Sequence, residues 1–148
     1  MSAYGPVADN PWGLALHPAG SRLYVSSAGA ASGLVVIDAA THATVADVSA
    51  STRAEPAVHP DGSRVYVGGA NEVLVVSTAS DTVVATVPLP GVAKPYGIAV
   101  HPDGSRVYVS DSFFRIFTIE TAGNTIIDVA SIGLGPYGVA VHPDETRV

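Results

Sequence analysis

The sequence predicts an all-β fold built from a repeated unit of four short antiparallel strands, and three observations carry this prediction. Val, Thr, Tyr, Gly and Pro are plentiful, whereas the helix-favouring Leu, Glu, Lys, Gln and Met are scarce. The dipeptide His-Pro recurs at His17, His59, His101 and His142, with spacings of 42, 42 and 41 residues. Around each copy the same order of apolar runs and turn signals returns. The repeat therefore covers the chain from about residue 10 to its end.

Each unit opens with a short apolar run, which is typical of a strand buried on both faces. A His-Pro-Asp-Gly-Ser turn follows, in which Pro presets φ and Gly accepts the left-handed backbone. We interpret the histidine of this turn as structural, because its four copies belong to four different units and cannot share one metal ion. The predicted first strands are Gly13–Leu16, Ala57–Val58, Gly97–Val100 and Gly138–Val141.

Three more strands follow in each complete unit. The second alternates apolar and polar residues with a period of two, as Leu23 and Val25 show, which indicates a β-strand. A tight turn at His42, Asp81 or Asn124 separates the third strand from the fourth. The predicted second strands are Arg22–Ser26, Arg64–Gly68 and Arg106–Ser110; the third are Leu34–Ile37, Val73–Val76 and Arg115–Ile119; the fourth are Thr44–Val48, Thr82–Val87 and Thr125–Ala130.

Composition narrows the class of protein further. The 148 residues are 47% hydrophobic, which suffices for one domain with an ordinary core. Because the chain has no Cys, disulfide scaffolds and thiolate metal sites are excluded. A net charge of −6 argues against a nucleic-acid partner. The chain has no run of about 18 apolar residues, so we expect no membrane partner, and its start does not look like a signal peptide.

A repeat of 41 or 42 residues that contains four short strands has the length and strand number of one β-propeller blade. We predict complete blades at about 11–49, 54–88 and 95–131, an N-terminal stub at 1–10 and a partial blade at 135–148. Residues 1–148 then form a single partial β-propeller of about 3.5 blades.

A propeller closes into a ring, so we expect the ring to be completed by oligomerisation, most simply as a homodimer. A two-fold axis allows only an even number of blades. Eight blades follow if the two chain ends build composite blades, and six follow if the extra strand joins an existing blade. The alternative is that the chain is an inactive fragment of a longer propeller.

The recurring segment PYGIAVHPDG followed by SRVYV resembles the YVTN-type β-propeller repeat family along essentially the whole chain. Related propellers include surface-layer and periplasmic proteins, lactonase-like enzymes and haem d1-binding domains. The resemblance implies a propeller fold and a periplasmic or extracellular location. The shared residues belong to the scaffold, so the resemblance transfers no catalytic residue.

Candidate binding residues are sought where the units differ. Three units read Pro-aromatic-Gly before the first strand, whereas the second unit reads Arg-Ala-Glu at the same place. In a propeller this segment lies at the mouth of the central channel, where ligands commonly bind. The alternative is that the aromatic residues only pack between blades. The predicted ligand-facing residues are Trp12, Arg53, Glu55, Lys94, Tyr96, Asp111 and Tyr137.

No phosphate-binding glycine loop, nucleophile elbow or metal-ligand cluster is recognisable, so we assign no catalytic residue, metal or cofactor. The sequence therefore favours a propeller scaffold or binding module whose ligand, a small molecule or a protein, is unassigned. The alternative is a lactonase- or lyase-like enzyme with its site at the central channel, which would need convergent acidic or histidine side chains there.

Overall fold

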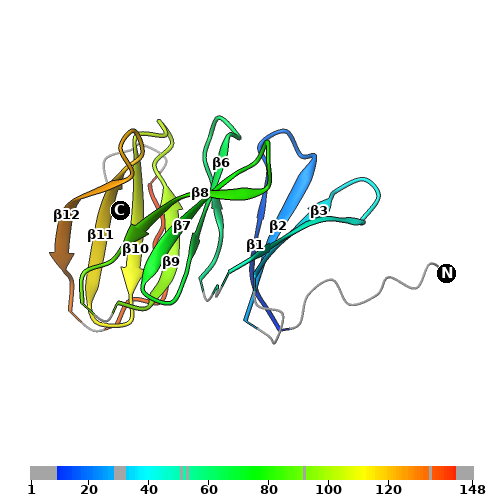
Figure 1. Cartoon of the computed structure of the whole chain (residues 1–148). Helices are drawn as coiled ribbons and strands as arrows, with labels where there is room; N and C mark the ends of the chain where they lie inside the picture. Colours follow the sequence, from blue (N-terminus) through cyan, green and yellow to red (C-terminus); the bar gives the residue numbers. More distant parts are fainter. Residues whose placement is uncertain are drawn as a thin grey trace.

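The computed structural model describes residues 10–28, 33–50, 52, 54–91, 93–133 and 135–142. These residues form three four-stranded antiparallel sheets and contain no helix, so the all-β prediction is confirmed. Accordingly, the described chain offers no helix that could cross a membrane. Figure 1 shows the three sheets side by side in chain order. The strands are β1 (Pro11–Leu16), β2 (Arg22–Ser27), β3 (Gly33–Asp38), β4 (Thr44–Ser49), β5 (Ala57–Val58), β6 (Arg64–Gly68), β7 (Glu72–Ser77), β8 (Thr82–Pro88), β9 (Pro95–Val100), β10 (Arg106–Asp111), β11 (Arg115–Glu120) and β12 (Thr125–Ser131).

Each sheet is a meander in which strands adjacent in the chain pair with each other, and we call it a blade. The pairing of the third and fourth strands shifts register once in every blade, as at a β-bulge. The turn before each fourth strand carries one residue in the left-handed region: His42 (φ 59°), Asp81 (φ 52°) and Asn124 (φ 51°). These are the turn positions that the sequence predicts.

The core lies between blades rather than inside one sheet. One cluster joins blade 1 to blade 2 and includes Tyr24 and Leu34 of the former and Val65 of the latter. A larger cluster joins blade 2 to blade 3, where Tyr66 and Phe117 are fully buried. Because each blade alternates its apolar side chains between its two faces, it is stabilised by burying both faces against neighbours.

Polar contacts at one end of the blades add to this packing. The Arg22 guanidinium of blade 1 donates to both Asp81 carboxylate oxygens (3.0 and 3.2 Å) and to the Thr78 carbonyl (2.8 Å) of blade 2. The Arg64 guanidinium makes the equivalent bond to the Thr121 carbonyl of blade 3 (3.0 Å). The same arginine position therefore ties each blade to the next one in the chain.

The first blade leaves one apolar face uncovered. Leu14 and Leu16 on β1 are 68% and 54% exposed. In blade 3, Ile98 stands at the position of Leu14 and is only 7% exposed, because blade 2 packs on it. The exposed face of β1 therefore corresponds, in the repeat, to the face of β9 that is buried against the neighbouring blade.

One predicted strand is absent. The structure assigns no strand to Gly138–Val141, because none of the described residues pairs with this segment in a ladder. The segment still lies where the first strand of a fourth unit would begin: a Cβ atom placed on Gly97 of β9 would come within 2.8 Å of the Gly138 Cα.

Candidate ligand-binding site

A row of aromatic rings follows the first strands of the units. Trp12 of β1, Tyr96 of β9 and Tyr137 all stand five residues before a His-Pro dipeptide. The centroids of Trp12 and Tyr96 are 6.4 Å apart with the ring planes tilted by 44°. Those of Tyr96 and Tyr137 are 5.4 Å apart in an edge-to-face arrangement, the geometry that aromatic quadrupoles favour. Three of the predicted site residues therefore form one continuous row.

The second blade contributes no ring to this row, because its equivalent residue is the fully buried Ala54. Ala54 is packed so tightly that a Cβ atom on Gly68 of β6 would lie 2.5 Å from the alanine Cβ. A ring does not fit there without moving β6, so Trp12 and Tyr96 are neighbours although they belong to blades 1 and 3.

Glycine lets the first strands approach each other beneath the rings. A Cβ atom on Gly13 would lie 2.7 Å from the Glu55 Cγ, so the Glu55 side chain occupies the space that glycine leaves free. The Glu55 N–H donates to the Tyr96 carbonyl (3.3 Å), which links blades 2 and 3. Glu55 is exposed and stands beside the aromatic row, whereas Arg53 lies outside the described residues.

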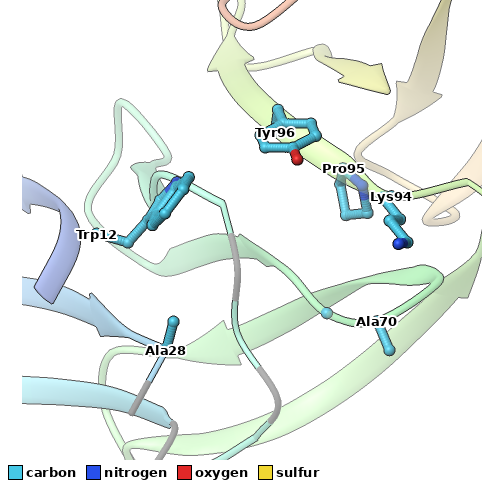
Figure 2. A pocket seen from close by; sticks show the side chains of 7 residues that line it. Trp12, Ala28, Ala70, Lys94, Pro95 and Tyr96 are labelled. Atoms are coloured by element: carbon cyan, nitrogen blue, oxygen red, sulfur yellow. The ribbon is translucent and has the colours of Figure 1, made fainter. Parts of the chain in front are cut away.

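A pocket of about 270 Å³ opens beside the rings of Trp12 and Tyr96, and both line it. Figure 2 shows Trp12 and Ala28 on one side of it and Tyr96, Pro95 and Lys94 on the other. Gly69 and Ala70, in the turn between β6 and β7, complete the lining. The two aromatic walls and Pro95 make this lining largely apolar.

Lys94 places a positive charge at the edge of this pocket. Its side chain is exposed, and it makes no ion pair or hydrogen bond with the residues that the structure describes. Its backbone carbonyl accepts from the Ser112 N–H (3.0 Å), which anchors the segment leading into β9. An ammonium group beside aromatic walls suits a ligand with a negative charge and a flat apolar part.

Asp111 is also near this end of the blades, but its carboxylate is used within the fold. The group is fully buried. One oxygen accepts from the Phe113 and Arg115 N–H groups (2.9 Å each), and the other accepts from the Arg115 guanidinium (2.7 and 2.8 Å). The Asp111 charge is therefore neutralised and shapes the turn between β10 and β11.

The repeated histidines bridge successive blades through their Nε2 atoms. The His17 ring contacts the Gly62 carbonyl at 3.0 Å, and the His59 ring contacts the Gly104 carbonyl at 2.9 Å. Because a carbonyl only accepts, Nε2 carries the proton in both rings. The geometry agrees with a structural role, and no group of three possible metal-ligating side chains occurs in the part of the chain that is described.

The Asp residues of these turns are held by their own backbone. Asp61 Oδ1 accepts from the Ser63 N–H (2.8 Å), and Asp103 Oδ1 accepts from the Ser105 N–H (2.7 Å). Hydrogen bonds from these serines lower the pKa of both carboxyl groups from 3.8 to about 2. Such local bonding is typical of Asx turns.

Four pocket residues were missed by the sequence interpretation: Ala28, Gly69, Ala70 and Pro95. Three of them are small and lie between the second and third strands of blades 1 and 2. The Gly-Gly-Ala run that begins at the last residue of β6 differs from the Ser-Asp-Ser run at the equivalent place in blade 3. The difference between the units at this turn is the sequence signal that indicates these residues.

Comparisons with protein-family models and with curated proteins found no match. Among solved structures, hydrazine synthase from Kuenenia stuttgartiensis is similar, with a TM-score of 0.84 and 26% identity over 98% of this chain and 43% of that chain. The structure of U3-55K and the crystal structure of the RRP9 WD40 repeats each have a TM-score of 0.77 and 12% identity over 88% of this chain. The match includes 41% of the U3-55K chain and 40% of the RRP9 chain. This chain therefore spans about two fifths of the length of each of the three proteins. The likeness shows a β-propeller fold.

Proposed function

We propose that the chain is a β-propeller binding module whose ligand occupies the pocket between Trp12 and Tyr96. The observation that carries this proposal is the departure of the second unit from the pattern of the others. Ala54 stands where the other units have an aromatic residue. The rings of Trp12 and Tyr96, from the units before and after it, line a pocket of about 270 Å³. Variation of one unit within a regular scaffold is how repeat folds acquire individual sites.

The lining indicates the class of ligand. Two rings and a proline ring offer flat apolar contact, and Lys94 offers a charge that no described residue neutralises. The volume of about 270 Å³ lies just below the usual range for ligand pockets, which is about 300–1,000 Å³. The ligand is thus a compact organic anion with a planar apolar portion, such as an aromatic carboxylate.

We also propose that the blades self-assemble into a closed ring through a second copy of the chain. The uncovered apolar face of blade 1, with Leu14 and Leu16 largely exposed, supports this. Solvent contact of such a face is unfavourable, and the equivalent faces of blades 2 and 3 are buried. The proposal includes the YVTN-type repeat as the scaffold of that ring, since its pattern recurs in each blade.

Trp12 is the only Trp of the chain and reports directly on the pocket. The protein is titrated with benzoate and naphthoate, and in parallel with the neutral amides of the same aromatic rings, while Trp12 fluorescence is recorded. We expect a saturable change for the carboxylates and weaker binding of the amides.

A substitution at Lys94 then separates the contribution of its charge to ligand binding from the contribution of the aromatic side chains. Lys94→Gln should abolish the preference for carboxylate over amide. Arg106→Gln is the matched control, because Arg106 is exposed and begins β10 at the opposite end of the blade. If no probe gives a saturable change, or if Lys94→Gln leaves the preference intact, the proposed site is wrong.

A further inference from the structure

The turn between β10 and β11 presents two phenylalanine rings to solvent. Phe113 and Phe114 lie next to each other in this turn and are 47% and 45% exposed. Large apolar side chains that lie together on the surface are typical of interaction sites. The corresponding turn of blade 2, between β6 and β7, contains only Gly, Ala and Asn. The two rings are therefore an addition of blade 3 to the common repeat.

Phe114 has a backbone conformation that phenylalanine rarely adopts. Its φ is 80°, in the region that favours glycine and asparagine. The Phe114 carbonyl accepts from the Ile132 N–H (2.8 Å). In blade 2 the Asn71 carbonyl accepts in the same way from the Leu89 N–H (3.0 Å), so Phe114 stands in the place of an asparagine. A bulky side chain that is kept at a strained position points to a function for that side chain.

Hydrogen bonds on both sides of the rings fix this turn. One oxygen of the buried Asp111 carboxylate accepts from the Phe113 and Arg115 N–H groups, at 2.9 Å each. The Ser112 N–H donates to the Lys94 carbonyl (3.0 Å). Because the backbone that carries the rings is already ordered, a partner that binds them loses little conformational freedom.

The exposure of the rings does not result from the lack of a neighbouring blade. Blade 2 is packed against a blade on each side, and yet Ala70 and Asn71 in its corresponding turn are exposed. Part of the unit that follows blade 3 is also in place, because a Cβ atom on Gly135 would lie 3.7 Å from the Ser112 carbonyl oxygen. These turns therefore lie at the ends of the blades, outside the faces that pack together.

The two rings lie close to the ligand pocket. Ala28 and Ala70, which line the pocket, stand four residues after the tyrosine of the second strand, as Ser112 does in blade 3. Ser112 is hydrogen-bonded to the backbone of Lys94, which also lines the pocket. Phe113 is the next residue in the chain. A ligand that is held by Lys94 can therefore extend from the pocket onto the rings.

We propose that Lys94, Phe113 and Phe114 form a docking surface for the free C-terminal end of a peptide chain. The inference rests on the ligand pocket proposed above and names its partner. A chain that ends in an aromatic residue supplies the carboxylate and the planar ring that suit this pocket. In an extended chain, side chains two positions apart lie on the same face, about 7 Å from each other. An apolar side chain two positions before the end then packs on the phenylalanine rings.

Charge favours this occupant over a second copy of the chain and over an anionic lipid surface. The net charge of the chain is −6, so both of these would bring like charges together. Lys94 has no ion-pair partner among the described residues and attracts a carboxylate. A chain end carries its carboxylate close to its apolar side chains, and it therefore matches both parts of the docking surface.

Peptide titration tests this docking surface. Trp12 fluorescence is recorded while the protein is titrated with acetyl-Leu-Gly-Phe and with acetyl-Gly-Gly-Phe, both with free C-termini. We expect the leucine peptide to bind about tenfold more tightly, because its additional side chain buries apolar surface on the two rings. The C-terminal amide of the leucine peptide should bind about tenfold more weakly than the acid, because it lacks the charge that Lys94 attracts.

Two substitutions remove the rings one at a time. Phe113→Ala and Phe114→Asn should each reduce the tenfold preference for the leucine peptide to about threefold or less and should leave benzoate binding unchanged. Val84→Ala is the matched control, since Val84 is 56% exposed on the outer strand β8 of blade 2. Because asparagine accepts a positive φ, Phe114→Asn should keep or raise the urea midpoint of unfolding. A lowered midpoint would give this ring a structural role and would contradict the proposal.

The remaining outcomes separate this inference from the pocket on which it rests. Equal affinities of the two peptides, or a preference that survives both substitutions, overturn the docking surface. An amide that binds as tightly as the acid overturns the assignment to a chain end. If benzoate binds and neither peptide does, the pocket stands and the docking surface is wrong, whereas both are wrong if no probe binds. Self-association, or binding to phosphatidylcholine vesicles, that is lost in Phe113→Ala would assign the rings to a second copy or a membrane and overturn the proposal.

Discussion

The link between blades 2 and 3 through the Gly104 carbonyl is open to a quantitative test. This carbonyl accepts two hydrogen bonds, one from His59 Nε2 (2.9 Å) and one from the Thr121 hydroxyl (2.7 Å). His59→Ala removes the first and also the acceptor of the Asp61 N–H (3.3 Å). Since the threonine hydroxyl still satisfies the carbonyl, we expect a loss of about 1–2 kcal/mol in the free energy of unfolding.

Thr121→Val is expected to cost about 1 kcal/mol for the same reason, because His59 remains. The double variant leaves the carbonyl of the buried Gly104 without either partner, and an unsatisfied buried acceptor costs about 1–3 kcal/mol more. We therefore predict that the two substitutions are not additive and that the coupling free energy is at least about 1 kcal/mol.

Urea unfolding followed by circular dichroism, at one fixed protein concentration, measures these values. With a slope of about 1–3 kcal/mol per M, His59→Ala should lower the midpoint by about 0.3–2 M. Asp128→Ala, at an exposed position of the edge strand β12, serves as the control. Additivity of His59→Ala and Thr121→Val within about 0.3 kcal/mol would refute the shared acceptor.

Three further predictions follow from single contacts. Because the pKa values of Asp61 and Asp103 are lowered to about 2, their contribution to stability is present above pH 3.8 and is lost as the pH falls toward 2. Thermal unfolding between these pH values should show the loss of stability. Replacing both residues by Asn should make that loss smaller. The buried Tyr66 hydroxyl has no hydrogen-bond partner in the described part of the chain, so Tyr66→Phe should leave the free energy of unfolding within about 0.5 kcal/mol of the wild type or raise it, as urea unfolding would show. Gly97→Ala would bring a methyl group within 2.8 Å of Gly138, so residues 136–142 should be displaced from β9 and cleaved faster in limited proteolysis. Gly138→Ala meets no atom within 4 Å and should be tolerated.

Local chemistry explains why much of the fold is predictable from the sequence. Strand alternation and turn residues act over a few positions, so the all-β blades follow from the repeat, and His42, Asp81 and Asn124 adopt the left-handed backbone where the turns were expected. The strand at Gly138–Val141 was wrongly predicted, because a strand exists only with a pairing partner and an apolar run does not supply one.

By itself, the sequence determined the repeat, the order of strands within each blade and the aromatic position that varies between units. Only the tertiary structure decided which of these side chains meet. It placed Trp12 beside Tyr96 across the small Ala54, and it buried Asp111 in an ion pair with Arg115. The physical reason is that a periodic pattern specifies the face on which a side chain lies, whereas its neighbours on the next blade depend on side-chain volumes summed across two separate units of the chain.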